Sequence, residues 1–219
     1  MRKDLETLLS HPRIWRGHSN PAGCHAFPTG HVLLDEVLPG GGWPKASLIE
    51  ILVEHHGTGE LQLLLPLLER LSQKDDRQGD SQQGTRGWLC WISPPYIPNA
   101  PALVAEGVDI SRVLLVHARD DHEALWAMDQ AMRSGGCELV LAWAEQAKGQ
   151  QLRRLQLAAE EGSTTGILFR PPAAIGESSA AALRLKLSTG KHGRIDIIKN
   201  RGGRPASLPA RDVTRPPHA

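Results

Sequence analysis

Short apolar runs alternate with amphipathic stretches along most of the chain. The runs are rich in Leu, Ile and Val and are bounded by Gly, Pro or polar residues, which is typical of buried strands. They predict strands at 47–53, 88–92, 113–116, 138–143 and 166–169. The 3.6-residue periodicity of the stretches between them predicts helices at about 60–71, 99–106, 120–134 and 150–161. This alternation indicates an α/β fold with a mostly parallel sheet.

The pattern changes after the two prolines at 171–172. Leucine occupies every second position from 183 to 187, and isoleucine occupies 195 and 197, while most of the positions between them are charged. Alternation with a period of two is typical of a strand with one apolar face. Two such strands joined through Gly-containing residues 189–193 predict a C-terminal antiparallel β-hairpin added to the sheet.

The length and composition suit a single domain with additional segments at both ends. The chain has 219 residues, of which 40% are hydrophobic, so it can bury a sizeable core. Pro and Gly interrupt residues 1–26, which we expect to form an irregular N-terminal arm. Residues 27–200 are the predicted domain, and residues 201–219 the predicted basic, disordered tail.

The same composition favours the cytoplasm. No apolar stretch approaches the roughly 20 residues that a membrane helix needs. Residues 1–10 lack the apolar region of a secretory signal. The three cysteines are widely spaced and form no C-x-x-C pair, which favours a reducing compartment and argues against a zinc site.

The net charge of the chain is +1, but the charges are unevenly distributed along the sequence. Residues 1–183 carry 16 basic and 22 acidic side chains, whereas residues 184–219 carry 9 basic and 2 acidic ones. A cationic end on an acidic body indicates either contact with nucleic acid or an acidic protein, or a solubilising and partly disordered end. The candidate contact residues are Lys191, Arg194, Lys199, Arg201 and Arg204.

The loop after the first long strand is in the position of a phosphate-binding P-loop. It consists of Glu54, His55, His56, Gly57, Thr58, Gly59 and Glu60. A P-loop needs G-x-x-x-x-G-K-[ST], because its Lys and backbone amides offset the phosphate charge. This loop has no Lys, and its two glutamates would repel a triphosphate. We therefore expect no ATP hydrolysis, no catalytic residues and no cofactor.

Two histidine-containing clusters have residue types that could bind a metal. His55 and His56 have no third ligand at a sensible spacing, so a surface loop is the better interpretation. The second cluster, residues 117–122, contains two His and two Asp, but Asp120 is also well placed to cap the helix that follows. We expect no metal at either cluster.

In the order and spacing of its motifs, the chain resembles the RecA ATPase core across about residues 27–200. The motifs that carry this resemblance are Phe27–Gly30, Leu34–Asp35, Gly40–Pro44, Ile49–Ile51, Trp88–Ile92, Gly107–Val113 and Asp129–Trp143. The nucleotide-loop Lys-Thr of that family falls near Gly59-Glu60, its catalytic Glu near Pro95, and its magnesium-orienting Asp near Ala142 or Trp143. The resemblance therefore implies a degenerate RecA-like fold without ATPase chemistry.

Two degenerate RecA-like families, ImuA and SulA, fit this description. Residues 61–71, 88–92 and 160–171 resemble both families, while 27–53 and 195–205 resemble ImuA. Membership of the ImuA family implies a non-catalytic accessory protein of SOS-induced error-prone translesion DNA synthesis. Its implied partners are the polymerase-like scaffold ImuB, RecA and a DnaE-type polymerase, with DNA as a further contact.

The alternative is a SulA-like inhibitor of cell division that binds FtsZ. A third class, a nucleotide-dependent enzyme with an unusual loop, would require nucleotide binding at residues 54–60.

Overall fold

The computed structural model describes residues 25–57, 59–73, 87–188 and 193–210. Its strands are β1 (Ala26–Phe27), β2 (Trp43–Pro44), β3 (Leu48–Val53), β4 (Trp88–Ile92), β5 (Val113–Val116), β6 (Cys137–Trp143), β7 (Thr165–Arg170), β8 (Leu183–Ser188), β9 (Arg194–Asn200) and β10 (Ala206–Pro209). Its helices are α2 (Val32–Val37), α3 (Leu65–Ser72), α4 (Ala100–Ala105), α5 (Asp121–Arg133) and α6 (Gly149–Glu161), with 3-10 turns η1 (Gln62–Leu64), η2 (Ile110–Arg112) and η3 (Pro172–Gly176). The N-terminal arm predicted for residues 1–26 falls mostly outside the described residues.

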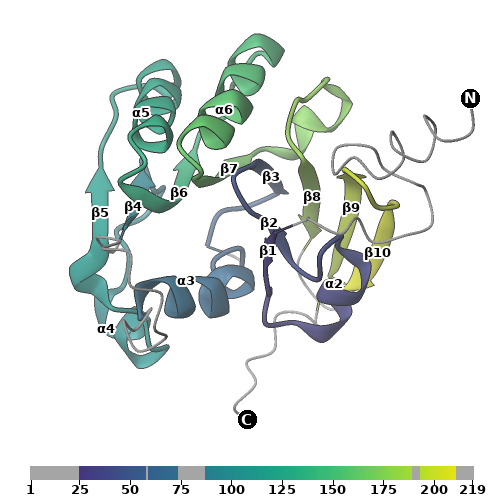
Figure 1. The fold of residues 1–219 in the computed structure, drawn as a ribbon, viewed down its shortest axis with the longest axis horizontal. Helices are drawn as coiled ribbons and strands as arrows, with labels where there is room; N and C mark the ends of the chain where they lie inside the picture. The colour runs from purple at the N-terminus through teal and green to yellow at the C-terminus, as the bar shows by residue number, and fades with distance from the viewer. Residues whose placement is uncertain (1–24, 58, 74–86, 189–192, 211–219) are drawn as a thin grey trace, which may run out of the picture.

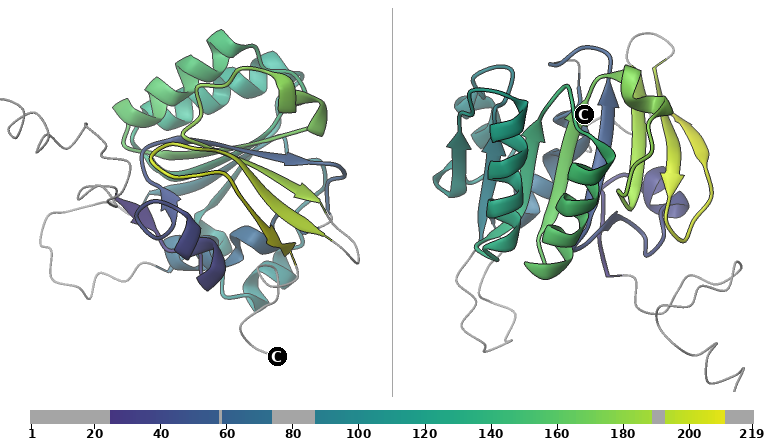
Figure 2. Two further views of the ribbon diagram at one scale, coloured as in Figure 1. Left: turned by 90° about the vertical axis from the view of Figure 1, so that its right-hand side faces the viewer. Right: turned by 90° about the horizontal axis from the view of Figure 1, so that it is seen from above.

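An eight-stranded mixed sheet runs through the centre of the molecule in the order β10-β9-β8-β3-β7-β6-β4-β5. The six strands from β8 to β5 pair in parallel, whereas β9 and β10 are antiparallel to their neighbours. Helices α5 and α6 cover one face, and α2 and α3 lie on the other (Figures 1 and 2). β1 and β2 form a separate two-stranded ladder.

The two faces of the sheet bury two different cores. Trp91, Trp143 and Phe169 pack on the α3 side, where the Trp143 and Phe169 rings stack with centroids 4.7 Å apart. Small and flexible side chains dominate the α5–α6 side, including Met128 and Met132. Because successive strand residues point to opposite faces, each apolar run serves both cores.

Pro66 explains why the helix predicted from residue 60 begins later. A proline inside a helix removes one backbone hydrogen bond and clashes with the preceding turn, whereas at the first helical positions it costs little. The chain accordingly forms the 3-10 turn η1, and α3 begins at Leu65 with Pro66 in its first turn.

Residues 201–210, the first part of the predicted disordered tail, have a defined structure. Residues 201–203 form a turn, and β10 then pairs with β9 through Ala206–Ile197 and Leu208–Ile195. Both isoleucines are buried. The basic residues suggested disorder, but Ala206–Pro209 forms a short strand that extends the sheet.

A buried ion-pair network joins the three strands β7, β3 and β8. The carboxylate of Glu50, fully buried on β3, lies 3.1 Å from Nη1 of Arg170 and 2.9 Å from Nε of Arg184. Arg170 also bonds the carboxylate of Glu177, and Arg184 donates to the carbonyl of Ala174 at 2.8 Å. The network therefore fastens the η3 segment over the sheet.

Replacing Glu50 should destabilise the fold strongly. Glu50→Gln leaves two buried guanidinium groups without their shared carboxylate, so we expect a loss of about 3–5 kcal/mol in the free energy of unfolding. Urea denaturation followed by circular dichroism measures it. The matched control is Glu177→Gln, because half of the Glu177 side chain is exposed and its pair should contribute less than about 1 kcal/mol. Equal losses in both variants would contradict the assigned role of Glu50.

Candidate functional site

The loop after β3 is closed by its own glutamate. The backbone N–H of Gly57 donates to Oε1 of Glu60 at 2.6 Å, and the Glu60 side chain is buried. In a P-loop, backbone N–H groups of this kind cradle phosphate oxygens. Here a carboxylate of the same chain takes the place that an anion would occupy.

The other described residues of this loop include a second carboxylate and two histidines. Glu54 is half-exposed and lies 3.7 Å from the ammonium of Lys186. His55 is exposed, and the Nδ1 atom of His56 is buried with no hydrogen-bond partner among the described residues. Gly57 has a φ of 79°, and a side chain there would press on the ring of Tyr96. Thr58 lies outside the described residues.

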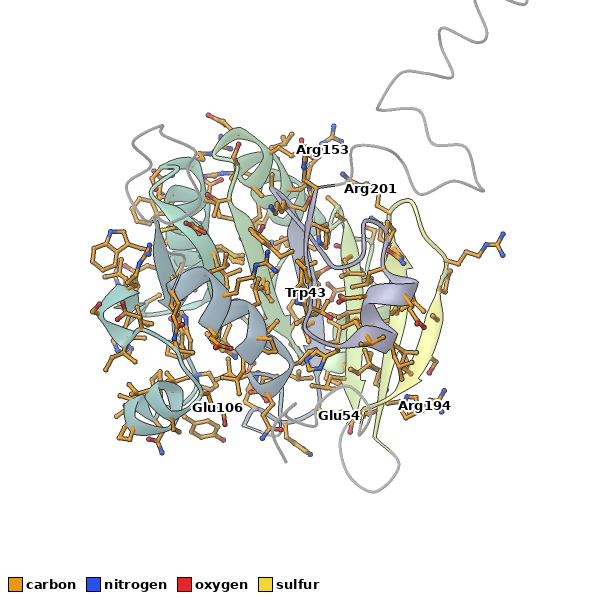
Figure 3. The ribbon with its side chains drawn as sticks, turned by 60° about the horizontal axis from the view of Figure 1, so that its bottom comes forward. Trp43, Glu54, Glu106, Arg153, Arg194 and Arg201 are labelled. Carbon is orange, nitrogen blue, oxygen red and sulfur yellow. The ribbon has the colours of Figure 1, made fainter. Side chains whose placement is uncertain are left out.

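The predicted basic contact residues do not form one surface. Arg194 stands at the start of β9 and Arg201 just beyond its end, so they lie at opposite ends of the strand (Figure 3). Arg194 donates to the hydroxyl of Ser207 at 2.7 Å, and Lys199 donates to the carbonyl of Ser179 at 2.8 Å.

Arg201 and Arg204 remain exposed beyond the end of β9. Lys191 lies outside the described residues. The structure thus places the described candidates at different points along β9 and beyond it, and their role as contact residues stays a prediction.

The acidic residues near His117 act at the start of α5. Asp120 accepts the backbone N–H of Glu123 at 2.8 Å, and Asp121 accepts the N–H of Gln146 at 2.8 Å. Capping of this kind satisfies helix donors that would otherwise lack a partner. The hydrogen bond to Glu123 thus supports the capping interpretation for Asp120, whereas Asp121 binds the loop before α6 instead.

An apolar surface that the sequence pattern did not predict lies at the opposite edge of the sheet from β10. β5 is the last strand of the order, yet Leu114 is 45% and Leu115 41% exposed. Leu114 pairs with Cys90 and Leu115 with Trp91, so the two leucines point to opposite faces of the sheet. Trp88 on β4 and Ile110 on η2 are also exposed. We call these four residues the β5 edge.

The β5 edge has two properties of a docking surface. An edge strand presents unpaired backbone groups to any further strand, and exposed apolar patches are uncommon away from interaction sites. Tyr96 and Ile97, in the loop after β4, are exposed as well, Ile97 at 90%. The run at 113–116 predicted a strand, but only the strand order reveals that it is half-covered.

The central part of the chain matches a family of known proteins. The family model described as "Cell division inhibitor SulA" matches residues 47–166, which run from just before β3 into β7. The chain belongs to the SulA family. The cell division inhibitor SulA of Edwardsiella piscicida is 34% identical over 122 residues, 56% of this chain and 66% of that protein. The SulA of Photorhabdus laumondii is 30% identical over 126 residues, 58% of this chain and 65% of that protein.

A solved structure, that of SulA from Pseudomonas aeruginosa, is also similar. The two sequences are 28% identical. The match covers 56% of this chain and 97% of the Pseudomonas aeruginosa chain, with a TM-score of 0.44. The matched part of this chain spans about two thirds of the length of the two relatives named above.

The match to the SulA family corrects the prediction of an ImuA protein. The assignment to translesion synthesis was wrong, and the partners that followed from it, ImuB, RecA and a DnaE-type polymerase, are corrected with it. Of the segments that favoured ImuA, 195–205 lies outside the residues that match the SulA family, and 27–53 overlaps them only at 47–53. None of the described helices is long and apolar enough to cross a membrane.

Truncating Glu60 should destabilise the loop without creating a nucleotide site. Glu60→Ala removes a buried carboxylate that accepts a backbone N–H, so we expect a loss of about 1.5–3 kcal/mol. Chemical denaturation measures the loss, and Glu54→Ala, which removes an exposed carboxylate, should cost less than about 1 kcal/mol. Fluorescent ATP should bind neither variant. ATP binding gained by Glu60→Ala would show that the loop retains the rest of a nucleotide site.

Proposed function

We propose that this chain inhibits cell division by binding FtsZ in the cytoplasm as part of the SOS response to DNA damage. The observation that carries the proposal is the family match over residues 47–166. Both curated relatives described above carry the name of cell division inhibitor. FtsZ is the partner implied by the resemblance to SulA.

We propose further that the inhibition is stoichiometric and involves no catalysis. The carboxylate of Glu60 bonds the Gly57 N–H, which supports a loop closed to nucleotide. The position of this loop after β3 of a largely parallel sheet also supports a degenerate RecA-like core. On this proposal, occupancy of FtsZ by the protein is what stops division, so the effect should scale with the amount of protein.

The β5 edge is the surface that we assign to FtsZ. It lies wholly within the residues that match the family, since it is built from Trp88, Ile110, Leu114 and Leu115. The candidate residues on β9 and beyond it lie outside that match. An apolar edge strand offers both backbone pairing and burial of side chains to a partner.

A charge at the β5 edge should abolish the inhibition. Leu115→Lys places an ammonium in the centre of the proposed interface, so we expect at least a tenfold loss in the capture of purified FtsZ, since burying an unpaired charge costs more than about 1.4 kcal/mol. Cells that express the unaltered chain should form filaments, and cells that express the variant should divide. Capture should not depend on ATP.

Leu157→Lys is the matched control for this experiment. Leu157 is 51% exposed on α6, so the variant carries the same new charge on a leucine of similar exposure outside the β5 edge. It should capture FtsZ and cause filaments as the unaltered chain does. Loss of capture in both variants, or in neither, would place the interface elsewhere. Failure of the unaltered chain to capture FtsZ would overturn the proposed function itself.

A further inference from the structure

A row of charged side chains crosses three neighbouring strands beside the η3 segment. Glu50 on β3 pairs in register with Arg184 on β8, and Arg184 pairs in register with Lys199 on β9. Residues that stand opposite one another on adjacent strands point to the same face of a sheet. Lys199 therefore continues the buried ion-pair network toward the solvent, because its own side chain is only partly buried.

Lys199 and two arginines hold the connection between β7 and β8 by its carbonyl groups. The ammonium of Lys199 donates to the carbonyl of Ser179 at 2.8 Å. Arg201 donates to the carbonyl of Ala180 at 3.3 Å, and Arg184 bonds further carbonyls of the same connection. A carbonyl oxygen carries no net charge, so these contacts bring cationic groups together without neutralising them.

These surroundings favour the uncharged form of the Lys199 amine. Burial lowers the pKa of Lys199, and the charges of Arg201 and Arg184 lower it further. The charge of Glu50 opposes this effect, but that carboxylate is already shared between Arg170 and Arg184. A lysine with a lowered pKa keeps more of its amine uncharged at neutral pH, and the uncharged amine is the nucleophile.

Arg201 places an exposed guanidinium beside this amine. It follows Lys199 by two residues, and its side chain is 56% exposed. One of its N–H groups donates to the Ala180 carbonyl, while Nη1 lies 3.7 Å from the Glu160 carboxylate, which is longer than a hydrogen bond. A guanidinium presents several N–H donors in a fixed plane, so Arg201 has donors left for the oxygen atoms of a phosphate.

We propose that Lys199 is a modification site that accepts an acyl group from a small acyl phosphate, whose phosphate group is bound by Arg201. In this reaction the lone pair of the uncharged amine attacks the acyl carbonyl carbon and forms a C–N bond. The C–O bond to the phosphate breaks, and inorganic phosphate leaves with that electron pair. The nitrogen loses a proton to the solvent, so the reaction needs neither an oxidant nor a reductant.

Acylation of Lys199 would weaken the attachment of the connection between β7 and β8. The acylated nitrogen keeps an N–H group but loses its charge, and hydrogen bonds from charged donors are the stronger ones. The bond to the Ser179 carbonyl would therefore weaken, while the contacts of Arg184 and Arg201 with the same connection would remain.

Incubation of the full chain with acetyl phosphate, followed by quantitative mass spectrometry, tests the proposal. Digestion with chymotrypsin does not depend on lysine, so modified and unmodified peptides can be compared at each lysine. We expect Lys199 to be acetylated at least about threefold faster at neutral pH than the exposed Lys148. The rate at Lys199 should rise with pH and reach its midpoint below 10.5, the ordinary pKa of a lysine, because only the uncharged amine reacts.

Two arginine variants test whether Arg201 binds the phosphate group. Arg201→Gln should slow the acetylation of Lys199 by acetyl phosphate at least about fivefold, since it removes a charged hydrogen-bond donor. The slowing should be at least about twofold smaller with N-hydroxysuccinimidyl acetate, which has no phosphate to bind. Arg204→Gln is the matched control, because Arg204 is exposed in the same turn, and it should change either rate by less than about twofold. Thermal melting confirms that each variant is folded.

Three results would overturn the proposal. If Lys199 reacts no faster than Lys148, its neighbours do not activate the amine. If Arg201→Gln and Arg204→Gln slow the reaction equally, or if Arg201→Gln slows both reagents equally, Arg201 does not bind the phosphate. None of these results depends on FtsZ, so the modification site and the proposed function are tested separately.

Discussion

A single buried carboxylate determines how the centre of the sheet is arranged. Glu50 lies on β3, between β8 and β7, and each of these neighbours supplies one arginine to it. An isolated charge in this position would cost far more than the fold could tolerate, so β3 is stable here only with both strands in register. The register that pairs Glu50 with Arg184 and Leu168 places both guanidinium groups within reach. The same arginines hold η3 by its carbonyl groups and by Glu177, so the connection between β7 and β8 is bound to the same point.

The dependence on Glu50 explains why the flanks of the chain cannot be treated as appendages. Glu50 belongs to the segment that matches the SulA family, whereas Arg170 and Arg184 follow it. In this chain the family segment thus completes its core with residues that lie outside it. β9 and β10 then build on β8, and α2 packs near β10, so the N-terminal and C-terminal flanks meet on one side of the sheet (Figure 1). The segments that resembled ImuA, 27–53 and 195–205, lie largely in these flanks.

Local patterns predicted the strands and the long helices because each apolar run or period is a property of neighbouring residues. Pro66 sets the start of α3, because its ring and its missing N–H are tolerated in the first turn of a helix. What the pattern could not predict is which strand lies next to which. Glu50 is one charged residue in an otherwise apolar run, and nothing near it in the sequence identifies Arg170 and Arg184 as its partners. Likewise, Leu114 and Leu115 look like core residues until the strand order places β5 at an edge. A count of charges does not distinguish the environments of these arginines. In the structure Arg184 is buried, Arg194 bonds a neighbouring serine, and Arg201 borders a cavity.

The loop at the end of β3 carries acidic side chains at a place where the backbone favours anions. The carboxyl end of a parallel strand is where α/β proteins commonly hold anions, because loop and helix N–H groups point there. Here the carboxylate of Glu60 bonds one of those N–H groups, and Glu54 adds negative charge beside it. The Glu60 carboxylate occupies a donor that a bound anion would need, and the charge of Glu54 opposes a second anion nearby. The exposed leucines of the β5 edge lie on the last strand of the sheet, so the surface that we propose for a protein partner is separate from this loop.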